Sequence, residues 1–350
     1  MSTNQKRMNQ MKLKKLICIG LLGVLCAISA VGCGKKESIK TTTKVSSEAN
    51  TKEASAQVFA MDTYMNLKAY GKNAQKAVDD AKSEIERLDQ LWSAVDKNSE
   101  IYQLNQKKKM KVSDETLELI EFAKKKSAQS GDAFDISVYP IVELWGFPTQ
   151  KYRVPSDSEI QSLLKNVDCQ KIKINKKTNV VTLEKNMKID LGGIAKGYIA
   201  DQLKAYLKEQ NVSHALINLG GNVLALGGKP DGSDYNIGIQ KPFAQNGEAI
   251  TSVKIKDQSV VSSGIYERYF KVGDKIYHHI LDPKTGYPYK NNLLGVSIVC
   301  DSSTEADALS TTCFAMGLDD GLKYIEGIKG AEALFITDDY EIHYSSGFPK

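Results

Sequence analysis

The sequence is poor in cysteine and histidine and lacks several catalytic signatures. Beyond residue 33 three cysteines remain, and none has C-x-x-C spacing (Cys169, Cys300 and Cys313). Neither a disulfide framework nor a zinc site is therefore indicated. The chain has four histidines and no H-E-x-x-H, G-x-S-x-G, G-x-x-x-x-G-K-[ST] or G-x-G-x-x-G motif. Zinc-hydrolase and α/β-hydrolase chemistry therefore have no support.

Outside its first residues the chain also lacks an excess of positive charge. Five of the 47 basic residues lie within residues 1–32, which hold no acidic residue, so the remaining 42 basic residues equal the 42 acidic ones. A nucleic-acid-binding protein needs a basic face on its folded part, so no nucleic-acid partner is expected. With 350 residues, 41% of them hydrophobic, the chain is long enough to bury a large core.

The N-terminus has the features of an export signal. Three lysines between residues 12 and 15 precede the apolar run Leu16–Val31, which is too short for a membrane-spanning helix of about 20 residues. The run ends Ala30-Val31-Gly32-Cys33, which resembles the lipobox of bacterial lipoproteins. That resemblance implies that residues 1–32 are a signal peptide and that Cys33 carries the lipid. The alternative is an ordinary secreted protein cleaved nearby, or an uncleaved anchor.

A tether is expected to follow the signal. Residues 33–57 contain no aromatic residue and few that could pack, so we expect them to be flexible, with a root-mean-square reach of roughly 25 Å. The expected location is therefore the cell membrane, lipid-anchored on its extracytoplasmic face, with the catalytic body close to the lipid.

Residues 58–350 show no long linker and no repeat, which predicts one continuous α+β unit of mixed or antiparallel sheets with packed helices. Helices are predicted at Ala74–Leu91, Ser113–Ser130, Ile194–Glu209 and Glu305–Met316, and a further one at Asp319–Ile325. Strands are predicted at Val58–Tyr70, Lys171–Ile174, Val180–Glu184, Ala215–Asn218, Asn222–Leu226, Tyr235–Ile239, Ala249–Ile255, Ser259–Ser262, Lys275–Ile280 and Gly295–Cys300.

A glycine-rich stretch, D-L-G-G-I-A-K-G-Y at residues 190–198, joins a predicted strand to a predicted helix. Gly192 and Gly193 would let backbone N–H groups approach an anion at the positive end of the helix dipole. Lys196 would add a mobile positive charge. The alternative is a plain helix start with a solvated lysine.

The stretch T-E-A-D-A-L-S-T-T at residues 304–312 places Asp307 and Thr311 four apart on a predicted helix, and so on one face. A carboxylate and a hydroxyl are oxygen ligands suited to Mg²⁺. The alternative is that Asp307 lies in the first helical turn and merely complements the dipole.

Two further stretches complete the set of candidate motifs. Residues 277–288 read as a strand that runs into an Asp-Pro-x-x-Gly turn, and polar residues at a strand end commonly line a site. Residues 130–147 are rich in aromatics and turn formers, and as pure structure they read as a helix end followed by a packed loop.

Taken together and in order, these motifs resemble the ApbE family of FAD:protein FMN transferases. The resemblance rests on M-D-T at 61–63, S-E-I at 99–101 with L-N at 104–105, S-G-D-A-F-D at 130–135, the 190–198 stretch, I-N-L-G-G-N at 217–222, S-S-G-I-Y-E-R at 262–268, H-H-I-L-D-P-K-T-G at 278–286 and A-D-A-L-S-T-T at 306–312.

The resemblance implies a set of site residues. Mg²⁺ would be held by the Ala195 carbonyl and the side chains of Asp307 and Thr311, and His279 would assist the acceptor hydroxyl. FAD would lie against the following residues and near the glycine-rich helix start: Met61, Trp92, Ser93, Ala94, Asp135, Gly193, Lys196, Tyr198 and Leu281. The family often has an aromatic residue at the position of Val95 that can stack on the flavin, and here nothing at that position can stack.

The implied reaction is phosphoryl transfer: a Thr or Ser hydroxyl of an extracytoplasmic or membrane-bound partner protein attacks the FMN-side phosphorus of FAD, and AMP leaves. Two alternatives stay open. A Mg²⁺-dependent FAD pyrophosphatase would use water as the nucleophile, and a non-catalytic flavin-binding lipoprotein would keep the pocket without the metal.

Overall fold

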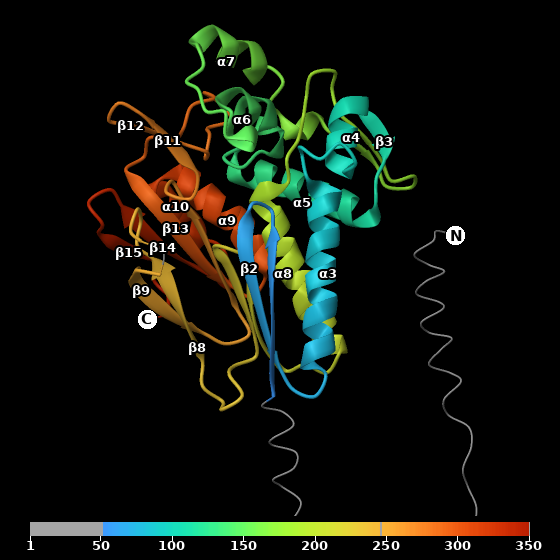
Figure 1. Cartoon of the computed structure of the whole chain (residues 1–350). Coiled ribbons are helices and arrows are strands. Elements are labelled where there is room, and N and C mark those ends of the chain that lie inside the picture. The colour runs from blue at the N-terminus through green and yellow to red at the C-terminus, as the bar shows by residue number, and fades with distance from the viewer. Residues whose placement is uncertain (1–51, 246, 350) are drawn as a thin grey trace, which may run out of the picture. The chain divides into compact units, whose positions relative to one another are not determined.

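An eight-stranded antiparallel sheet forms the centre of the computed structural model, which describes residues 52–245 and 247–349 (Figure 1). The strand order is β1-β2-β6-β7-β10-β13-β14-β15, and every pairing is antiparallel. The strands are β1 (Glu53–Ala60), β2 (Thr63–Tyr70), β6 (His214–Asn218), β7 (Asn222–Leu226), β10 (Ser259–Gly264), β13 (Leu293–Cys300), β14 (Ala331–Thr337) and β15 (Ile342–Tyr344).

Four helices cover one face of this sheet: α3 (Ala74–Trp92), α8 (Gly192–Glu209), α9 (Ser303–Met316) and α10 (Leu318–Glu326). The hairpin of β8 (Tyr235–Gln240) and β9 (Ala249–Ile255) covers the other face. Side chains of β13 therefore alternate between two cores: Val296 and Ile298 pack toward α9, whereas Leu294 and Val299 pack toward β8 and β9. Because both faces are buried, this strand is a continuous apolar run.

The segment between β2 and β6 builds most of the upper part of the molecule in Figure 1. Its further helices are α4 (Glu100–Lys107), α5 (Asp114–Ser130), α6 (Tyr139–Trp145) and α7 (Asp157–Leu164), with 3₁₀ turns at Ile136–Val138, Phe147–Thr149 and Cys169–Lys171. A small sheet holds β3 (Lys109–Lys111), β5 (Val180–Thr182) and β4 (Lys173–Asn175). A separate hairpin, β11 (Tyr269–Val272) with β12 (Lys275–His278), comes from the later chain.

Two helices with explicit cap residues, α5 and α9, lie where the sequence predicts them. Ser113 accepts a hydrogen bond from the Thr116 N–H at the start of α5, and Gly131 ends that helix in the left-handed region with φ +62°. Ser302 likewise caps α9, which starts two residues earlier than predicted and ends at Gly317. The buried stripe predicted for α8 (Ile194, Tyr198, Leu203 and Leu207) is also present.

Three predictions about elements are wrong. The single strand predicted over residues 58–70 is a hairpin that turns at Met61 and Asp62, both with positive φ. Strand β1 starts at Glu53, so the expected boundary between tether and body at residue 58 falls too late. Residues 53–57 lack the pattern of large apolar residues that predicts a strand, because the side chains that face inward there are small alanines. The expected packed loop over residues 130–147 contains α6, while α4, α7, β3, β11, β14 and β15 were not predicted.

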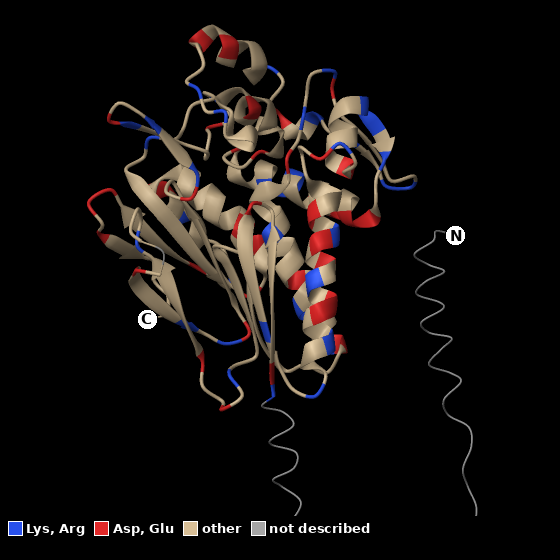
Figure 2. Cartoon of the chain, in the orientation of Figure 1, with Lys and Arg blue, Asp and Glu red and all other residues tan. Residues whose placement is uncertain are grey.

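The predicted fold class, α+β with antiparallel sheets and packed helices, is confirmed. None of the helices in residues 52–245 and 247–349 is both long and apolar enough to cross a bilayer. The expected signal peptide, tether and acylated Cys33 lie outside the described residues, apart from the end of the tether, which belongs to β1. Figure 2 shows acidic and basic segments interspersed over the described body.

Candidate active site

The candidate site is centred where α8 crosses α9. A Cβ atom at Gly197 would lie 2.4 Å from the Ser303 carbonyl oxygen and 2.7 Å from Thr304 Cα. The two helix backbones are therefore in direct contact, which only glycine at this position permits. This close approach brings the glycine-rich motif of α8 against the first turns of α9.

Asp307 lies on α9 and faces this crossing. It is buried, and its Oδ2 accepts a hydrogen bond of 2.8 Å from the backbone N–H of Gly197. Its Oδ1 has no hydrogen-bond donor among the described residues. Burial raises the pKa of Asp307 to about 6, whereas Lys196 and the Gly197 N–H lower it. A buried carboxylate with one free oxygen is suited to a cation.

The alternative role for Asp307, complementing the dipole of its own helix, is not what the structure shows. Asp307 is the fifth residue of α9, and its carboxylate accepts from the Gly197 N–H of α8. Asp201 of α8 supplies the carboxylate at the start of α9, because it accepts hydrogen bonds of 2.9 Å from the backbone N–H groups of both Ser303 and Thr304. Asp201 carries no local sequence signal, since its partners are about one hundred residues away.

Thr311 lies one turn beyond Asp307 on α9, as predicted, and is half-buried. Its hydroxyl is 3.3 Å from the Ser263 hydroxyl on β10. Ala195 lies two residues before Gly197, the residue that donates to Asp307. No group of three or more His, Cys, Asp or Glu side chains is arranged to hold a metal in the part of the chain that the structure describes. A site here would use a carboxylate, a hydroxyl and a carbonyl, an all-oxygen donor set that fits Mg²⁺.

The glycines at the start of α8 lie inside its first turn, not in a loop before it. A Cβ at Gly193 would be 3.1 Å from the Phe134 ring, so this glycine lets the 130–135 segment pack against the helix start. A Cβ at Gly192 would be 3.1 Å from Asp190 Oδ2. Burial raises the pKa of Asp190, whereas the Gly192 N–H and Arg268 lower it. The N-terminus of α8, which is the positive end of its dipole, thus already lies next to the Asp190 carboxylate.

Lys196 is half-buried and links α8 to the loop between β6 and β7. Its Nζ donates a 2.9 Å hydrogen bond to the Gly220 carbonyl. Gly220 has φ +73°, and a Cβ there would be 2.3 Å from Thr63 Oγ1, so the loop packs tightly on the β1–β2 hairpin. The positive charge of Lys196 also lowers the pKa of both Asp307 and Glu267. The lysine is therefore not a solvated surface residue.

Arg268 connects the β1–β2 turn to the segment before β11. Its Nη2 donates to the Met61 carbonyl over 3.3 Å and lies 3.6 Å from Asp62 Oδ2. The Met61 N–H donates to Asp89 Oδ1 on α3 over 3.1 Å. The turn that carries Met61 is therefore held from both sides at the edge of the site. Sequence analysis assigned no role to Arg268 or Asp89.

His279 follows β12 and is half-buried beside Arg268. Its backbone N–H donates to the Arg268 carbonyl over 3.1 Å, and its Nδ1 lies 3.2 Å from the same oxygen. Since a carbonyl only accepts, Nδ1 carries the proton and Nε2 keeps its lone pair. Burial lowers the pKa of His279 to about 3, and the positive charge of Arg268 acts in the same direction. The ring is therefore neutral near pH 7.

The neighbouring His278 predicts an acid-sensitive stability. It is buried, its Nε2 lies 3.0 Å from the Tyr289 carbonyl, and burial lowers its pKa to about 4. The unfolded chain takes up this proton near pH 6.5 but the folded chain does not, so the free energy of unfolding should fall by about 2 kcal/mol from pH 7 to pH 5 through this group. Urea unfolding of His278→Gln should lose this part of the pH dependence. An unchanged pH dependence in the variant would contradict the assignment.

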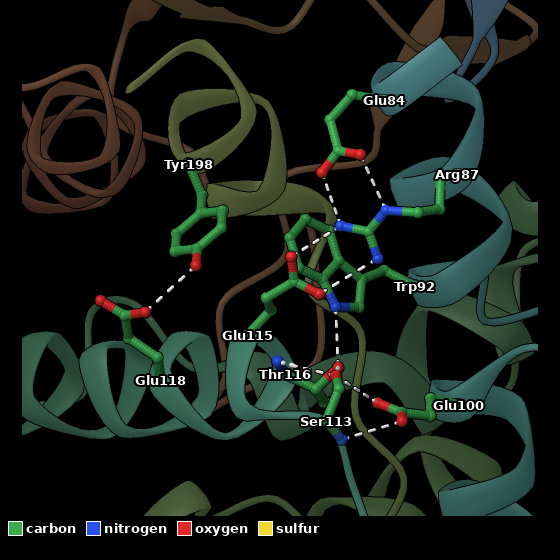
Figure 3. A network of polar contacts seen from close by, with 9 residues as sticks. All are labelled: Glu84, Arg87, Trp92, Glu100, Ser113, Glu115, Thr116, Glu118 and Tyr198. Carbon is green, nitrogen blue, oxygen red and sulfur yellow. Dashed lines mark hydrogen bonds and ion pairs between the residues drawn. The ribbon is translucent and has the colours of Figure 1, made fainter. Parts of the chain in front are cut away.

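Trp92 and Tyr198 meet in a polar network between α3, α5 and α8 (Figure 3). Their ring centroids are 5.4 Å apart at an interplanar angle of 79°. The Trp92 indole N–H donates to Thr116 Oγ1 over 2.9 Å, and the Tyr198 hydroxyl donates to Glu118 over 3.1 Å. Both side chains are buried. The two predicted FAD neighbours thus lie in contact with each other.

The other predicted FAD contacts lie on three separate elements. Ser93 caps the C-terminus of α3, and the Ala94 carbonyl accepts from the Tyr139 hydroxyl over 3.4 Å. The buried Asp135 carboxylate accepts from the backbone N–H groups of Ser137 and Cys169. The remaining two differ in exposure: Leu281 is in the core with α6, and Val95 is 55% exposed. Direct contact of these residues with FAD stays a prediction.

The model of the ApbE family matches residues 61–335 of this chain. The FAD:protein FMN transferase of Klebsiella pneumoniae (strain 342) is 37% identical over 266 residues, which cover 75% of this chain and 82% of that protein. The FAD:protein FMN transferase of Treponema pallidum (strain Nichols) is 31% identical over 349 residues, 93% of each chain.

Solved structures agree with these matches. The ApbE protein of Thermotoga maritima superposes with a TM-score of 0.80 at 31% identity and covers 85% of this chain and all of its own. The apo form of the Pseudomonas stutzeri flavinyl transferase ApbE gives a TM-score of 0.76 at 26% identity, over 85% of this chain and 96% of its own. The chain belongs to the ApbE family, and the predicted enzyme class, a transferase, is confirmed.

Proposed function

We propose that this protein transfers FMN from FAD to a Thr or Ser hydroxyl of a partner protein, with Mg²⁺ as cofactor and AMP as leaving group. The observation that carries the proposal is the buried Asp307 carboxylate at the α8–α9 crossing, bonded to the Gly197 N–H beside Lys196, in a member of this family. The names of its relatives, FAD:protein FMN transferases, support the same reaction.

Asp307, Thr311 and the Ala195 carbonyl would hold the Mg²⁺. Bound there, the ion would neutralise charge on the pyrophosphate oxygens. The free Oδ1 of Asp307 and the all-oxygen donor set support this assignment.

The residues of the chain itself would position the reactants. Lys196 is held toward the loop between β6 and β7 and contributes positive charge beside Asp307. His279 has Nδ1 engaged by the Arg268 carbonyl, so Nε2 is the atom that would take the proton of the attacking hydroxyl. The hydroxyl oxygen bonds to the FMN-side phosphorus, and the bond from that phosphorus to the bridging oxygen breaks, so AMP leaves with that oxygen.

A mass measurement tests the proposed function. The full-length chain is incubated with FAD, Mg²⁺ and candidate acceptor proteins, and each acceptor is examined for an FMN phosphodiester adduct while AMP is quantified. We expect adduct and AMP in equal amounts. AMP with free FMN, at a rate indifferent to every acceptor, would instead establish the pyrophosphatase. Tight flavin binding without any AMP would establish the non-catalytic lipoprotein.

We further propose that the enzyme is held by a lipid on Cys33 at the extracytoplasmic face of the cell membrane and modifies membrane-bound or neighbouring acceptors. The lipobox-like sequence that ends at Cys33 supports this. Replacing Cys33 with serine should release the protein from membranes in detergent-free fractionation and leave the turnover of the purified chain unchanged. Retention of Cys33→Ser in the membrane fraction would count against lipidation at this residue.

A further inference from the structure

The proposed substrate creates an electrostatic difficulty, because the site is rich in carboxylates. Five acidic side chains surround the start of α8 and the β1–β2 turn: Asp62, Asp89, Asp190, Glu267 and Asp307. The pyrophosphate of FAD adds two more negative charges. The basic side chains that act on these carboxylates are Lys196 and Arg268. Beside the proposed Mg²⁺, these two side chains are the cations of the chain that could offset the charge of a pyrophosphate bound among the carboxylates.

Arg268 has the donors for this contact. Its side-chain contacts to the Met61 carbonyl and to Asp62 are both made by Nη2. Within the described residues, Nη1 and Nε donate to no protein atom. The side chain remains 47% exposed. Nη1 and Nε are therefore open donors on different edges of the guanidinium, and each can donate to a phosphate oxygen.

Lys196 is less free to do this. Its Nζ already donates to the Gly220 carbonyl, and its ammonium is a single point of charge with no fixed fork. Arg268 also has a link to the reacting end of the site, because its carbonyl holds both the backbone N–H and Nδ1 of His279. The positive charge of Arg268 also acts on this histidine, because it lowers the pKa of His279.

We propose that Arg268 is a substrate-binding residue that donates hydrogen bonds from Nη1 and Nε to the pyrophosphate of FAD. This inference rests on the proposed function, since it takes FAD as the substrate. Asp62 pairs with the guanidinium while no substrate is bound. Its negative charge would repel the phosphates of FAD. The side chain of Asp62 is 74% exposed, so it can turn away without breaking a buried contact.

A simpler role for Arg268 is purely structural: its side chain would hold the β1–β2 turn in place beside β11. The two roles make different predictions for ligands with and without phosphate. If Arg268 binds the pyrophosphate, its loss should weaken the binding of FAD and ADP but not of riboflavin, which has the flavin ring and no phosphate. If Arg268 only holds the β1–β2 turn, its loss should change the binding of all three ligands, because the turn would move.

The test measures binding to the full-length chain in the presence of a metal chelator, with flavin fluorescence for FAD and riboflavin and with ADP as a competitor. Arg268→Ala should weaken FAD about tenfold or more and abolish competition by ADP, while the affinity for riboflavin changes less than about twofold. Arg153→Ala is the matched control, because Arg153 is equally exposed and also pairs with one carboxylate and one carbonyl. It should change none of the three affinities.

Equal weakening of FAD and riboflavin in Arg268→Ala, or no weakening of FAD, would overturn the inference. Asp62→Asn keeps the test informative if Arg268→Ala fails to fold: it removes a competing negative charge and should tighten FAD by about two- to fivefold without affecting riboflavin. Weaker FAD binding in Asp62→Asn would contradict us. None of these measurements needs an acceptor protein, so failure of the proposed transfer reaction would be seen separately, as a missing FMN adduct.

Discussion

Replacement of Asp307 with alanine should lower Mg²⁺-dependent turnover by about 10²–10³-fold or more and leave most of the fold intact. The physical reason is that Asp307 has one oxygen without a donor among the described residues and would supply the only charged ligand in the proposed metal site. The rate of AMP formation, measured against Mg²⁺ concentration, checks the result, and thermal unfolding checks the fold.

Two companion variants separate charge from packing. Asp307→Asn keeps the shape and an acceptor for the Gly197 N–H, yet it should lose nearly as much turnover as the alanine variant, because it removes the charge. Thr311→Val should lose less, since water can replace a neutral ligand. If Asp307→Ala unfolds the chain and the surviving folded fraction keeps its metal dependence, Asp307 is a structural residue and the metal assignment is wrong.

Gly197→Ala should be among the most destabilising single substitutions, at about 3 kcal/mol or more of unfolding free energy. The added Cβ would lie 2.4 Å from the Ser303 carbonyl oxygen, and backbone atoms of two long helices cannot move apart locally. Any separation of α8 from α9 also lengthens the 2.8 Å contact between Asp307 and the Gly197 N–H. Denaturant unfolding measures the loss of stability, and a Mg²⁺ titration of turnover measures the effect on the site.

The control for this substitution is Gly327→Ala. Gly327 ends α10 with φ −83°, it is exposed, and a Cβ there would find its nearest neighbour at 3.4 Å, an ordinary contact. This variant should change stability by less than about 1 kcal/mol. Equal stabilities for Gly197→Ala and Gly327→Ala would show that the helix crossing can relax, and the argument for glycine at this position would fail.

Helices α5 and α9 were predictable from strong local signals. Helices α5 and α9 begin at serines that cap them and end at glycines, and each of these signals lies within a few residues of the feature it determines. The spacing of Asp307 and Thr311 on one helix is equally local. These features follow from backbone hydrogen bonding and helical periodicity, which do not depend on the rest of the fold.

The turn at Met61 and Asp62 was not predictable in the same way. Both residues have positive φ, a conformation for which the usual signal is Asn-Gly, and neither residue matches it. The turn is held instead by Asp89 on α3 and by Arg268, which is 207 residues away from Met61 in the chain. Tertiary contacts therefore stabilise a conformation that local preference disfavours.

By itself the sequence determined the α+β class, most helices of the sheet-covering layer and the motifs that mark the family, because these depend on short-range periodicity, caps and residue identity. The tertiary structure alone decided how the motifs meet. It placed Asp201 at the start of α9, closed α8 on α9 through Gly197, and set Arg268 between the β1–β2 turn and His279. These contacts join residues far apart in the chain, and only the packing of the whole body brings them within hydrogen-bond distance.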